Sequence, residues 1–139
     1  MTNFESSTKT ILADRKQVFE FLSDINNFAT LVPEGKVRDF ESGRDYARFH
    51  VDGLGEVGIR IVTENPYETI IFGSEGSVPF GFSLQVNLSG ADPGLTVMNL
   101  SMEADLNVMM KMMARKPLED GIEMVASRLT EHLNQRQWT

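Results

Sequence analysis

The sequence predicts an α+β domain in which an antiparallel sheet is covered by one long C-terminal helix. Two observations support this class: residues from about 33 to 104 mostly alternate between apolar and polar, as strands do, and about the last 30 residues carry apolar side chains at helical spacing. A chain of 139 residues has the usual size of one domain and can bury roughly 70% of the surface that its unfolded form exposes. We therefore expect residues 1–139 to form a single domain with one core.

The N-terminal part reads as a strand followed by two short helices. Residues 4–12 are a β-rich run. Asp14, followed three residues later by Gln17, has the pattern of a capping box, and apolar residues then recur at helical spacing as far as Ile25. A second short helical turn is expected around Phe28.

Turn sequences divide the middle of the chain into six strands. Glycine, proline, asparagine and aspartate are the residues that tight turns require, and they cluster between the alternating runs. The five turns are ESGRD (41–45), DGLGE (52–56), ENPYE (64–68), GSEGSVP (73–79) and GADPG (90–94). These six antiparallel strands follow the N-terminal strand, so seven strands are expected in all.

The C-terminal helix is expected to lie on this sheet through an apolar stripe about 100° wide. The stripe consists of Leu118, Ile122, Val125, Ala126, Leu129 and Leu133. Pro117 removes the hydrogen bond to the carbonyl of Met113, so we expect the helix to kink or restart there. Charge placement agrees, because cations (Lys111, Arg115 and Lys116) precede the proline and anions (Glu119 and Asp120) follow it.

This order of elements resembles the START-like (SRPBCC) superfamily of lipid-transfer, coenzyme Q-binding-like and polyketide cyclase/dehydrase-like proteins. The resemblance is carried by ADRKQVFEFLSDINNFATLVP after the first strand and by LNVMMKMMARKPLEDGIEMVASRLTEHL at the end, and it covers nearly the whole chain. It rests on element order and apolar pattern and not on a catalytic motif, so it implies a fold more than an activity. The implied fold is the helix-grip fold, in which a curved seven-stranded antiparallel sheet wraps around a long, kinked C-terminal helix and an apolar ligand lies between them.

Strand alternation predicts which side chains would line such a cavity. The predicted lining residues are Phe49, Val57, Ile59, Phe80, Phe82, Leu84, Val86, Met98, Leu100 and Met102 on the sheet and Met109, Met110 and Met113 on the helix. The charged strand residues have the opposite parity, so no ionisable group is expected on this face. Ser6, Thr8 and Thr10 are the candidates for polar cavity groups, if Phe4 and Leu12 point inward. The same apolar residues would also suit a filled core.

Several function classes are disfavoured by composition. The net charge of −7 opposes binding to nucleic acid, and a chain without cysteine has neither a thiol nucleophile nor a thiolate metal site. His50 and His132 are isolated from other catalytic or ligating residues, so we assign no catalytic residue and no metal. GLGEVG, residues 53–58, matches G-x-G-x-x-G, but a strand follows it where a dinucleotide site needs a helix, so no cofactor is expected.

The sequence favours a protein that binds or carries a hydrophobic small molecule or lipid in the cavity between sheet and helix. Two alternatives stay open: an enzyme of the cyclase or hydratase type that uses the same cavity, and a protein-binding adaptor with a filled core. Met124 and Trp138 lie off the helical stripe and are the candidates for exposed apolar contacts, including a homodimer contact. No apolar window is long enough to cross a bilayer and the N-terminus lacks an apolar signal region, so we expect a cytoplasmic protein without membrane insertion.

The methionines before Pro117 raise one further hypothesis. Met109, Met110, Met112 and Met113 lie side by side, and unbranched thioether side chains repack easily around different ligands. Residues 106–116 would then form a segment, hinged at Pro117, that opens to admit ligand. The alternative is a static kink that only fits the helix to a curved sheet.

Overall fold

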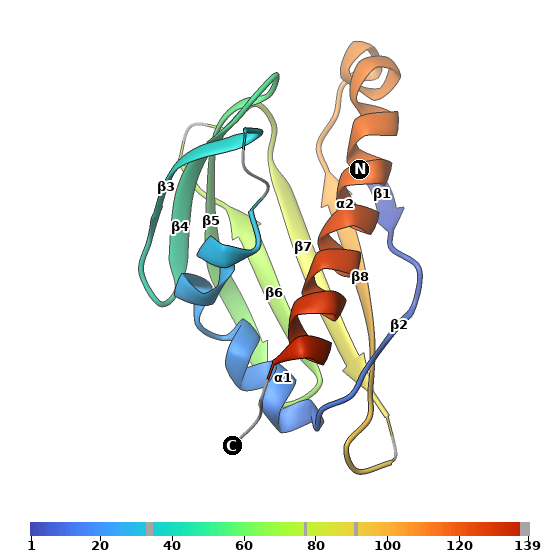
Figure 1. Ribbon diagram of the computed structural model, residues 1–139. Helices are drawn as coiled ribbons and strands as arrows, with labels where there is room; N and C mark the ends of the chain where they lie inside the picture. Colours follow the sequence, from blue (N-terminus) through green and yellow to red (C-terminus); the bar gives the residue numbers. More distant parts are fainter. Residues whose placement is uncertain (33–34, 77, 91, 137–139) are drawn as a thin grey trace.

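The computed structural model describes residues 1–32, 35–76, 78–90 and 92–136, and it shows a curved antiparallel sheet gripping one long helix (Figure 1). The strands are β1 (Thr2–Glu5), β2 (Lys9–Ile11), β3 (Val37–Ser42), β4 (Tyr46–Val51), β5 (Gly55–Asn65), β6 (Thr69–Ser74), β7 (Phe82–Ser89) and β8 (Thr96–Ala104). The helices are α1 (Arg15–Leu22), the 3-10 helix η1 (Ile25–Thr30) and α2 (Val108–Gln135). This is the predicted α+β class and the predicted order of elements.

The sheet has eight strands because the first strand of the prediction is broken in two. The strand order is β1-β8-β7-β6-β5-β4-β3, and β2 also pairs with β8. Phe4 pairs with Met102, but Lys9 pairs with Met98, so the register shifts by one residue between β1 and β2. A one-residue shift reverses which side chains face the helix. The six strands from β3 to β8 agree with the five predicted turns.

The α1 helix begins where its capping sequence predicted. The side chain of Gln17 accepts a hydrogen bond from the backbone N–H of Asp14 at 3.0 Å, as in a capping box. The carboxylate of Asp14 also accepts a hydrogen bond from the backbone N–H of Gly94, in the turn between β7 and β8. These two contacts fix α1 across one end of the sheet.

The α2 helix is capped by Asn107, whose side chain accepts a hydrogen bond from the backbone N–H of Met110 at 2.8 Å. It continues as a single helix through Pro117, without the restart that the sequence allowed. Two ion pairs span the proline, Arg115–Glu119 at 3.2 Å and Lys116–Asp120 at 3.0 Å. The charges that predicted two helix ends therefore stabilise one uninterrupted helix.

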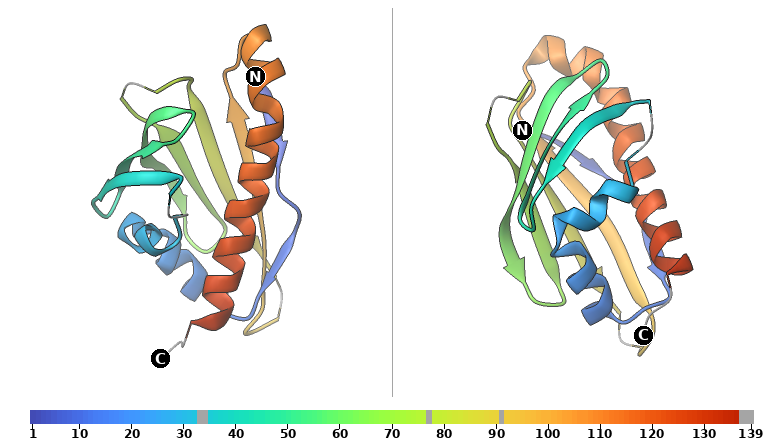
Figure 2. Two further views of the ribbon diagram at one scale, coloured as in Figure 1. Left: turned by 45° about the horizontal axis from the view of Figure 1, so that its top comes forward. Right: turned by 60° about the vertical axis from the view of Figure 1, so that its left-hand side comes forward.

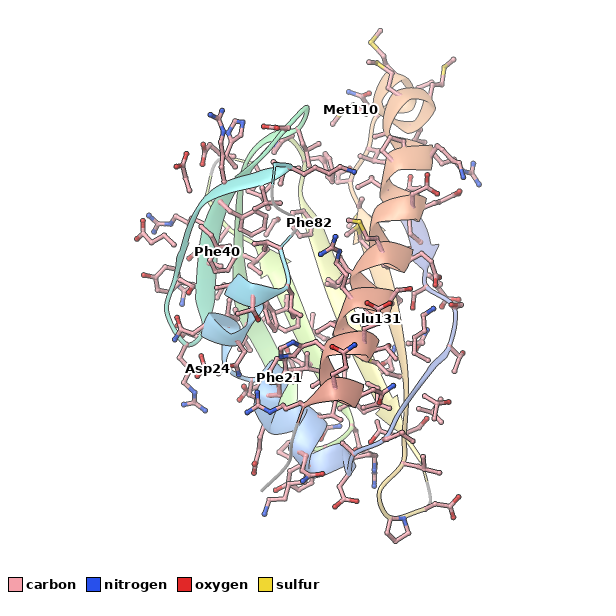
Figure 3. All side chains as sticks on the ribbon, viewed as in Figure 1. Phe21, Asp24, Phe40, Phe82, Met110 and Glu131 are labelled. Atoms are coloured by element: carbon pink, nitrogen blue, oxygen red, sulfur yellow. The ribbon has the colours of Figure 1, made fainter. Side chains whose placement is uncertain are left out.

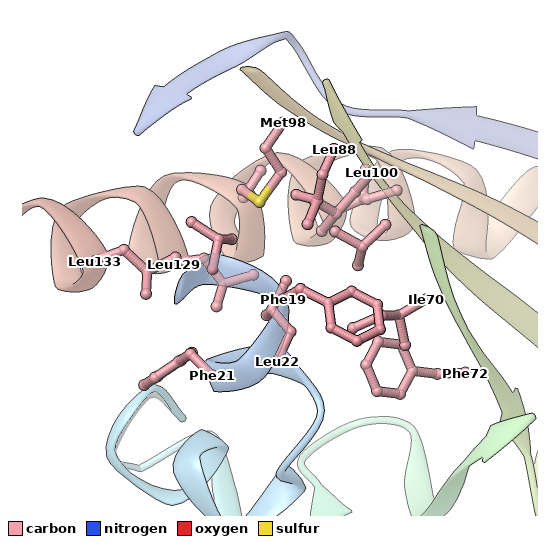
Figure 4. Packing of buried hydrophobic residues seen from close by; sticks show 14 of the residues in the cluster. Phe19, Phe21, Leu22, Ile70, Phe72, Leu88, Met98, Leu100, Leu129 and Leu133 are labelled. Carbon is pink, nitrogen blue, oxygen red and sulfur yellow. The ribbon is translucent and has the colours of Figure 1, made fainter. Parts of the chain in front are cut away.

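The core lies at the end of the sheet that α1 covers (Figures 2 and 4). The α2 helix packs against β1, β2 and β8, and His132 in its C-terminal half packs against Phe21 of α1. The close-up shows Leu129 and Leu133 facing side chains of α1 and the sheet. Four members of the predicted stripe are buried, namely Ile122, Ala126, Leu129 and Leu133. Leu118 is half-buried. Val125 is 41% exposed, because it lies at the edge of the stripe, and its placement is a correction to the prediction.

Candidate functional site at the open end of the interior

Side chains that face α2 change from buried to partly exposed along β7 and β8. On β7, Leu88 and Val86 are 4% and 1% exposed, whereas Leu84 and Phe82 on the same face are only half-buried. On β8, Met98 and Leu100 are fully buried, but Met102, farther along the same face, is half-buried. Along β7 and β8 the inward side chains are therefore buried at one end, whereas at the other end Phe82, Leu84 and Met102 stay half-buried beside the buried Phe4 and Ala104.

The α2 helix repeats this change. On α2, Ile122 and Leu129 are buried, whereas Leu118 and Met110, nearer to the start of the helix, are half-buried. We call the half-buried apolar residues of this region the open end of the interior: Phe40, Phe49, Ile59, Phe82, Leu84, Met102, Met110 and Leu118. Each packs on the core but keeps part of its surface accessible.

Aromatic rings are prominent at the open end. Phe40 on β3 and Phe49 on β4 stack with ring centroids 5.7 Å apart and an interplanar angle of 19°. Phe80 and Phe82 make an edge contact at 6.1 Å. Figure 3 shows Phe40 and Phe82 on the sheet side of the interior and Met110 at the first turn of α2. The open end thus presents flat apolar surfaces from β3 and β4 and from β7.

The predicted lining residues fall into three groups. Phe49, Ile59, Phe82, Leu84, Met102 and Met110 belong to the open end. Val57, Phe80, Val86, Met98 and Leu100 are buried among other side chains. Met109 and Met113 are 71% and 75% exposed, and their assignment to the cavity wall is corrected. They lie roughly 60–100° around α2 from the half-buried Met110, which is enough to turn them to solvent.

The three polar candidates do not line the open end. The hydroxyl of Ser6 is buried and accepts a hydrogen bond from the backbone N–H of Leu100 at 2.9 Å, in place of a strand contact. Thr8 and Thr10 are exposed, because the register shift between β1 and β2 turns Lys9 and Ile11 inward instead. The prediction failed because it assumed uninterrupted alternation through residues 4–12.

Thr2 is a polar residue that the sequence reasoning missed. Its Oγ1 is buried and has no hydrogen-bond partner among the residues that the structure describes. Thr2 pairs with Ala104 and shares the inner face with Phe4, two residues later on β1. The same strand alternation that placed Phe4 on the inner face also places Thr2 there, so the sequence could have indicated it.

An ionisable pair lies where β2 meets α2, contrary to the expectation that no charge faces the helix. Lys9 Nζ is 2.8 Å from Glu123 Oε2, and the same carboxylate accepts hydrogen bonds from the backbone N–H and the hydroxyl of Ser7, both at 2.7 Å. The hydrogen bond from Lys9, followed by those from Ser7, lowers the pKa of Glu123 from 4.5 to about 2. This contact joins α2 to the break between β1 and β2.

The histidines lie away from the open end. His50 Nδ1 is 3.1 Å from Glu56 Oε1 on the outer face of the sheet, and the ring of His132 packs against Phe21 with centroids 5.3 Å apart. In the described part of the chain, no three His, Cys, Asp or Glu side chains gather as a metal site. Met124 is half-buried, and Trp138 lies outside the described residues.

None of the described helices is long and apolar enough to span a bilayer.

Comparison with known proteins gives a structural match without a sequence match. No protein-family model and no curated protein matches the chain. A START superfamily protein from Mycobacterium smegmatis aligns with a TM-score of 0.69 at 15% identity, over 96% of this chain and 97% of that one. The Aha1 dimer from Colwellia psychrerythraea aligns with a TM-score of 0.71 at 15% identity, over 97% and 98%.

Norcoclaurine synthase from Thalictrum flavum, in complex with dopamine and hydroxybenzaldehyde, aligns with a TM-score of 0.74 at 9% identity, over 99% of this chain and 89% of that one. At such low identities the likeness shows the fold and carries no activity with it. The long helix gripped by the curved sheet and the agreement with these structures give one conclusion: the chain has the START-like helix-grip fold.

Proposed function

We propose that the protein binds or carries an apolar small molecule or lipid at the open end of the interior, between the sheet and α2. The observation that carries this proposal is the difference in packing along one sheet face, where Leu88 is 4% exposed and Leu84, four residues earlier, is half-buried. A filled core would bury both residues alike. Apolar surface left accessible on an inner face is a surface that a ligand can cover.

The composition of the open end suggests what kind of molecule would fit. All eight residues are apolar and three are phenylalanine, so affinity would come from removing apolar surface from water, at about 25 cal/mol per Å². The rings favour flat or branched apolar groups, and Met102 and Met110 can adjust to the shape of the ligand. Dopamine and hydroxybenzaldehyde, bound by norcoclaurine synthase, are small aromatic molecules held by the same fold at 9% identity.

A dye titration with a matched pair of variants tests the proposal. Nile red, a neutral solvatochromic dye, would be titrated into the parent protein, Leu84→Trp and Leu88→Trp, and each melting curve would be recorded. If space exists beside Leu84, the larger ring should fill it, abolish dye binding and cost no more than about 1–3 kcal/mol of stability. Leu88 has no such space, so Leu88→Trp should unfold the domain or lower its melting temperature far more.

Two results would count against the proposal. Equal destabilisation by both substitutions would mean that the open end is as tightly packed as the core. Unchanged dye binding in a folded Leu84→Trp variant would mean that the dye binds elsewhere.

A further inference from the structure

The start of α2 carries a cluster of exposed apolar side chains. Val108, Met109, Met112 and Met113 are 76%, 71%, 84% and 75% exposed, and we call these four residues the methionine tip. In Figures 1 and 2 the first turns of α2 extend past the end of β8. Met110 in the same turns is half-buried and packs on the core, and it belongs to the open end. The tip is thus an apolar surface separate from the open end and adjacent to it.

Positive charge lies within the tip and directly behind it. The whole chain has a net charge of −7, yet residues 108–116 contain Lys111, Arg115 and Lys116 and no acid. A shallow groove on this side of α2 is lined by Lys111, Met112, Arg115, Lys116 and Glu119. A helix rises 1.5 Å per residue, so Lys116 lies about 6 Å along the axis from Met112 and Glu119 about 10 Å. Lys111 thus lies within the tip, Arg115 and Lys116 follow it, and the acids Glu119 and Asp120 come next.

The nearby acids do not cancel this arrangement. Glu119 and Asp120 pair with Arg115 and Lys116, but all four side chains are at least 48% exposed. Exposed pairs of this kind contribute little to stability, so phosphate groups can compete for the cations. Asp105, exposed just before the tip, is the acid nearest to it in sequence.

We propose that the methionine tip docks this protein on the surface of an anionic lipid bilayer. The apolar side chains would enter the boundary between headgroups and acyl chains, and Lys111, Arg115 and Lys116 would lie at the level of the phosphates. Such docking is peripheral and needs no membrane-spanning segment. Local charge complementarity supports this partner, because residues 108–116 carry three cations and no acid, opposite in sign to the phosphates of an anionic bilayer, although the chain as a whole is acidic. Docking would also bring Met110 and the open end close to the bilayer.

Vesicle sedimentation tests the apolar part of the surface. The full chain would be mixed with phosphatidylcholine vesicles, with or without 30% phosphatidylserine, and the bound fraction measured. Binding should require phosphatidylserine, and Met112→Ser combined with Met113→Ser should weaken it by at least about tenfold. Leu12→Ser combined with Val62→Ser is the matched control, because these residues are 63% and 64% exposed on other elements. The control should bind like the parent.

A second pair of variants tests the charges. Lys111→Gln should weaken binding roughly fivefold, as expected for one cation near an anionic surface, while Lys16→Gln on α1 should not. Glu119→Gln combined with Asp120→Asn frees two cations and should strengthen binding. Raising the salt from 0.1 M to 1 M should weaken it.

Three results would overturn the proposal: no binding of the parent to anionic vesicles, equal losses in the tip and control variants, or a concentration-dependent dimer that the Met112→Ser and Met113→Ser changes abolish. Nile red binding without vesicles is an independent control, because the tip variants leave the open end intact. Loss of vesicle binding with normal dye binding would separate the docking surface from the proposed ligand site.

Discussion

The hydroxyl of Thr2 is buried at the edge of the sheet without a hydrogen-bond partner among the described residues. An unsatisfied buried hydroxyl costs about 1–3 kcal/mol, because it gives up its hydrogen bonds to water. The equally buried hydroxyl of Thr96 is different, since it donates to the carbonyl of Ala13 at 2.7 Å. Two threonines on neighbouring strands therefore have opposite energetic roles.

Thr2→Val should raise the free energy of unfolding by about 1 kcal/mol, because valine has the same shape and loses only the unpaired hydroxyl. Thr96→Val should lower it by a similar amount, because the carbonyl of Ala13 loses its donor. Urea denaturation of both variants measures the two effects. Destabilisation by Thr2→Val would show that the hydroxyl has a partner, such as a bound ligand.

The elements differ in how far they could be predicted. The capping box of α1 and the turns between β3 and β8 depend on neighbouring residues, so the sequence contains their signals. The break at Ser6 depends on pairing with Leu100, which is 94 residues away in the chain. Local alternation cannot reveal such a contact, and for this reason Thr8 and Thr10 were assigned to the wrong face.

The contact between Glu123 and the strand break predicts a pH dependence. The pKa of Glu123 is about 2 in the folded protein, below its ordinary value of 4.5. The contribution of its contacts to stability is therefore complete above about pH 4.5 and is lost as the pH falls toward 2. Glu123→Gln should therefore destabilise the protein more at pH 6 than at pH 2.5, as measured by urea unfolding. Glu119→Gln, which removes an exposed pair within α2, is the control and should show a smaller difference.

Equal destabilisation by Glu123→Gln at both pH values would contradict this assignment.

Pro117 gives α2 a weak point between its exposed start and its buried half. The missing N–H leaves the Met113 carbonyl without its helical donor, and Pro117→Ala should stabilise the helix by about 1–3 kcal/mol. If residues 106–116 act as a gate, the variant should also slow amide hydrogen exchange there and slow the release of bound Nile red. Pro93→Ala, in the turn between β7 and β8, is the control. If the release rate is unchanged in Pro117→Ala, residues 106–116 do not act as a gate, and the proline only fits the helix to the curved sheet.

At the scale of the whole molecule, the two ends of the helix-grip fold differ. At one end α1 closes the core over Leu129 and Leu133, and at the other the half-buried residues and the methionine tip lie close together. The sequence predicted the sheet and its gripped helix, because alternation and helical periodicity are strong over long segments. It could not predict which inward residues stay accessible, because Leu84 and Leu88 have the same residue type and parity. Their burial depends on the elements packed beside them, and α1 contacts β6 and β7.

The methionines allow a direct test of the proposed ligand site, because they are distributed over both ends. Methyl groups labelled with carbon-13 would be observed by NMR while 4-benzoyloxy-TEMPO, a neutral apolar spin label, is added. The proposed site predicts strong broadening of Met102 and Met110, which belong to the open end, and little change at Met98, which is fully buried in the core. Broadening confined to the exposed Met109, Met112 and Met113, with Met102 and Met110 unaffected, would contradict the proposed site.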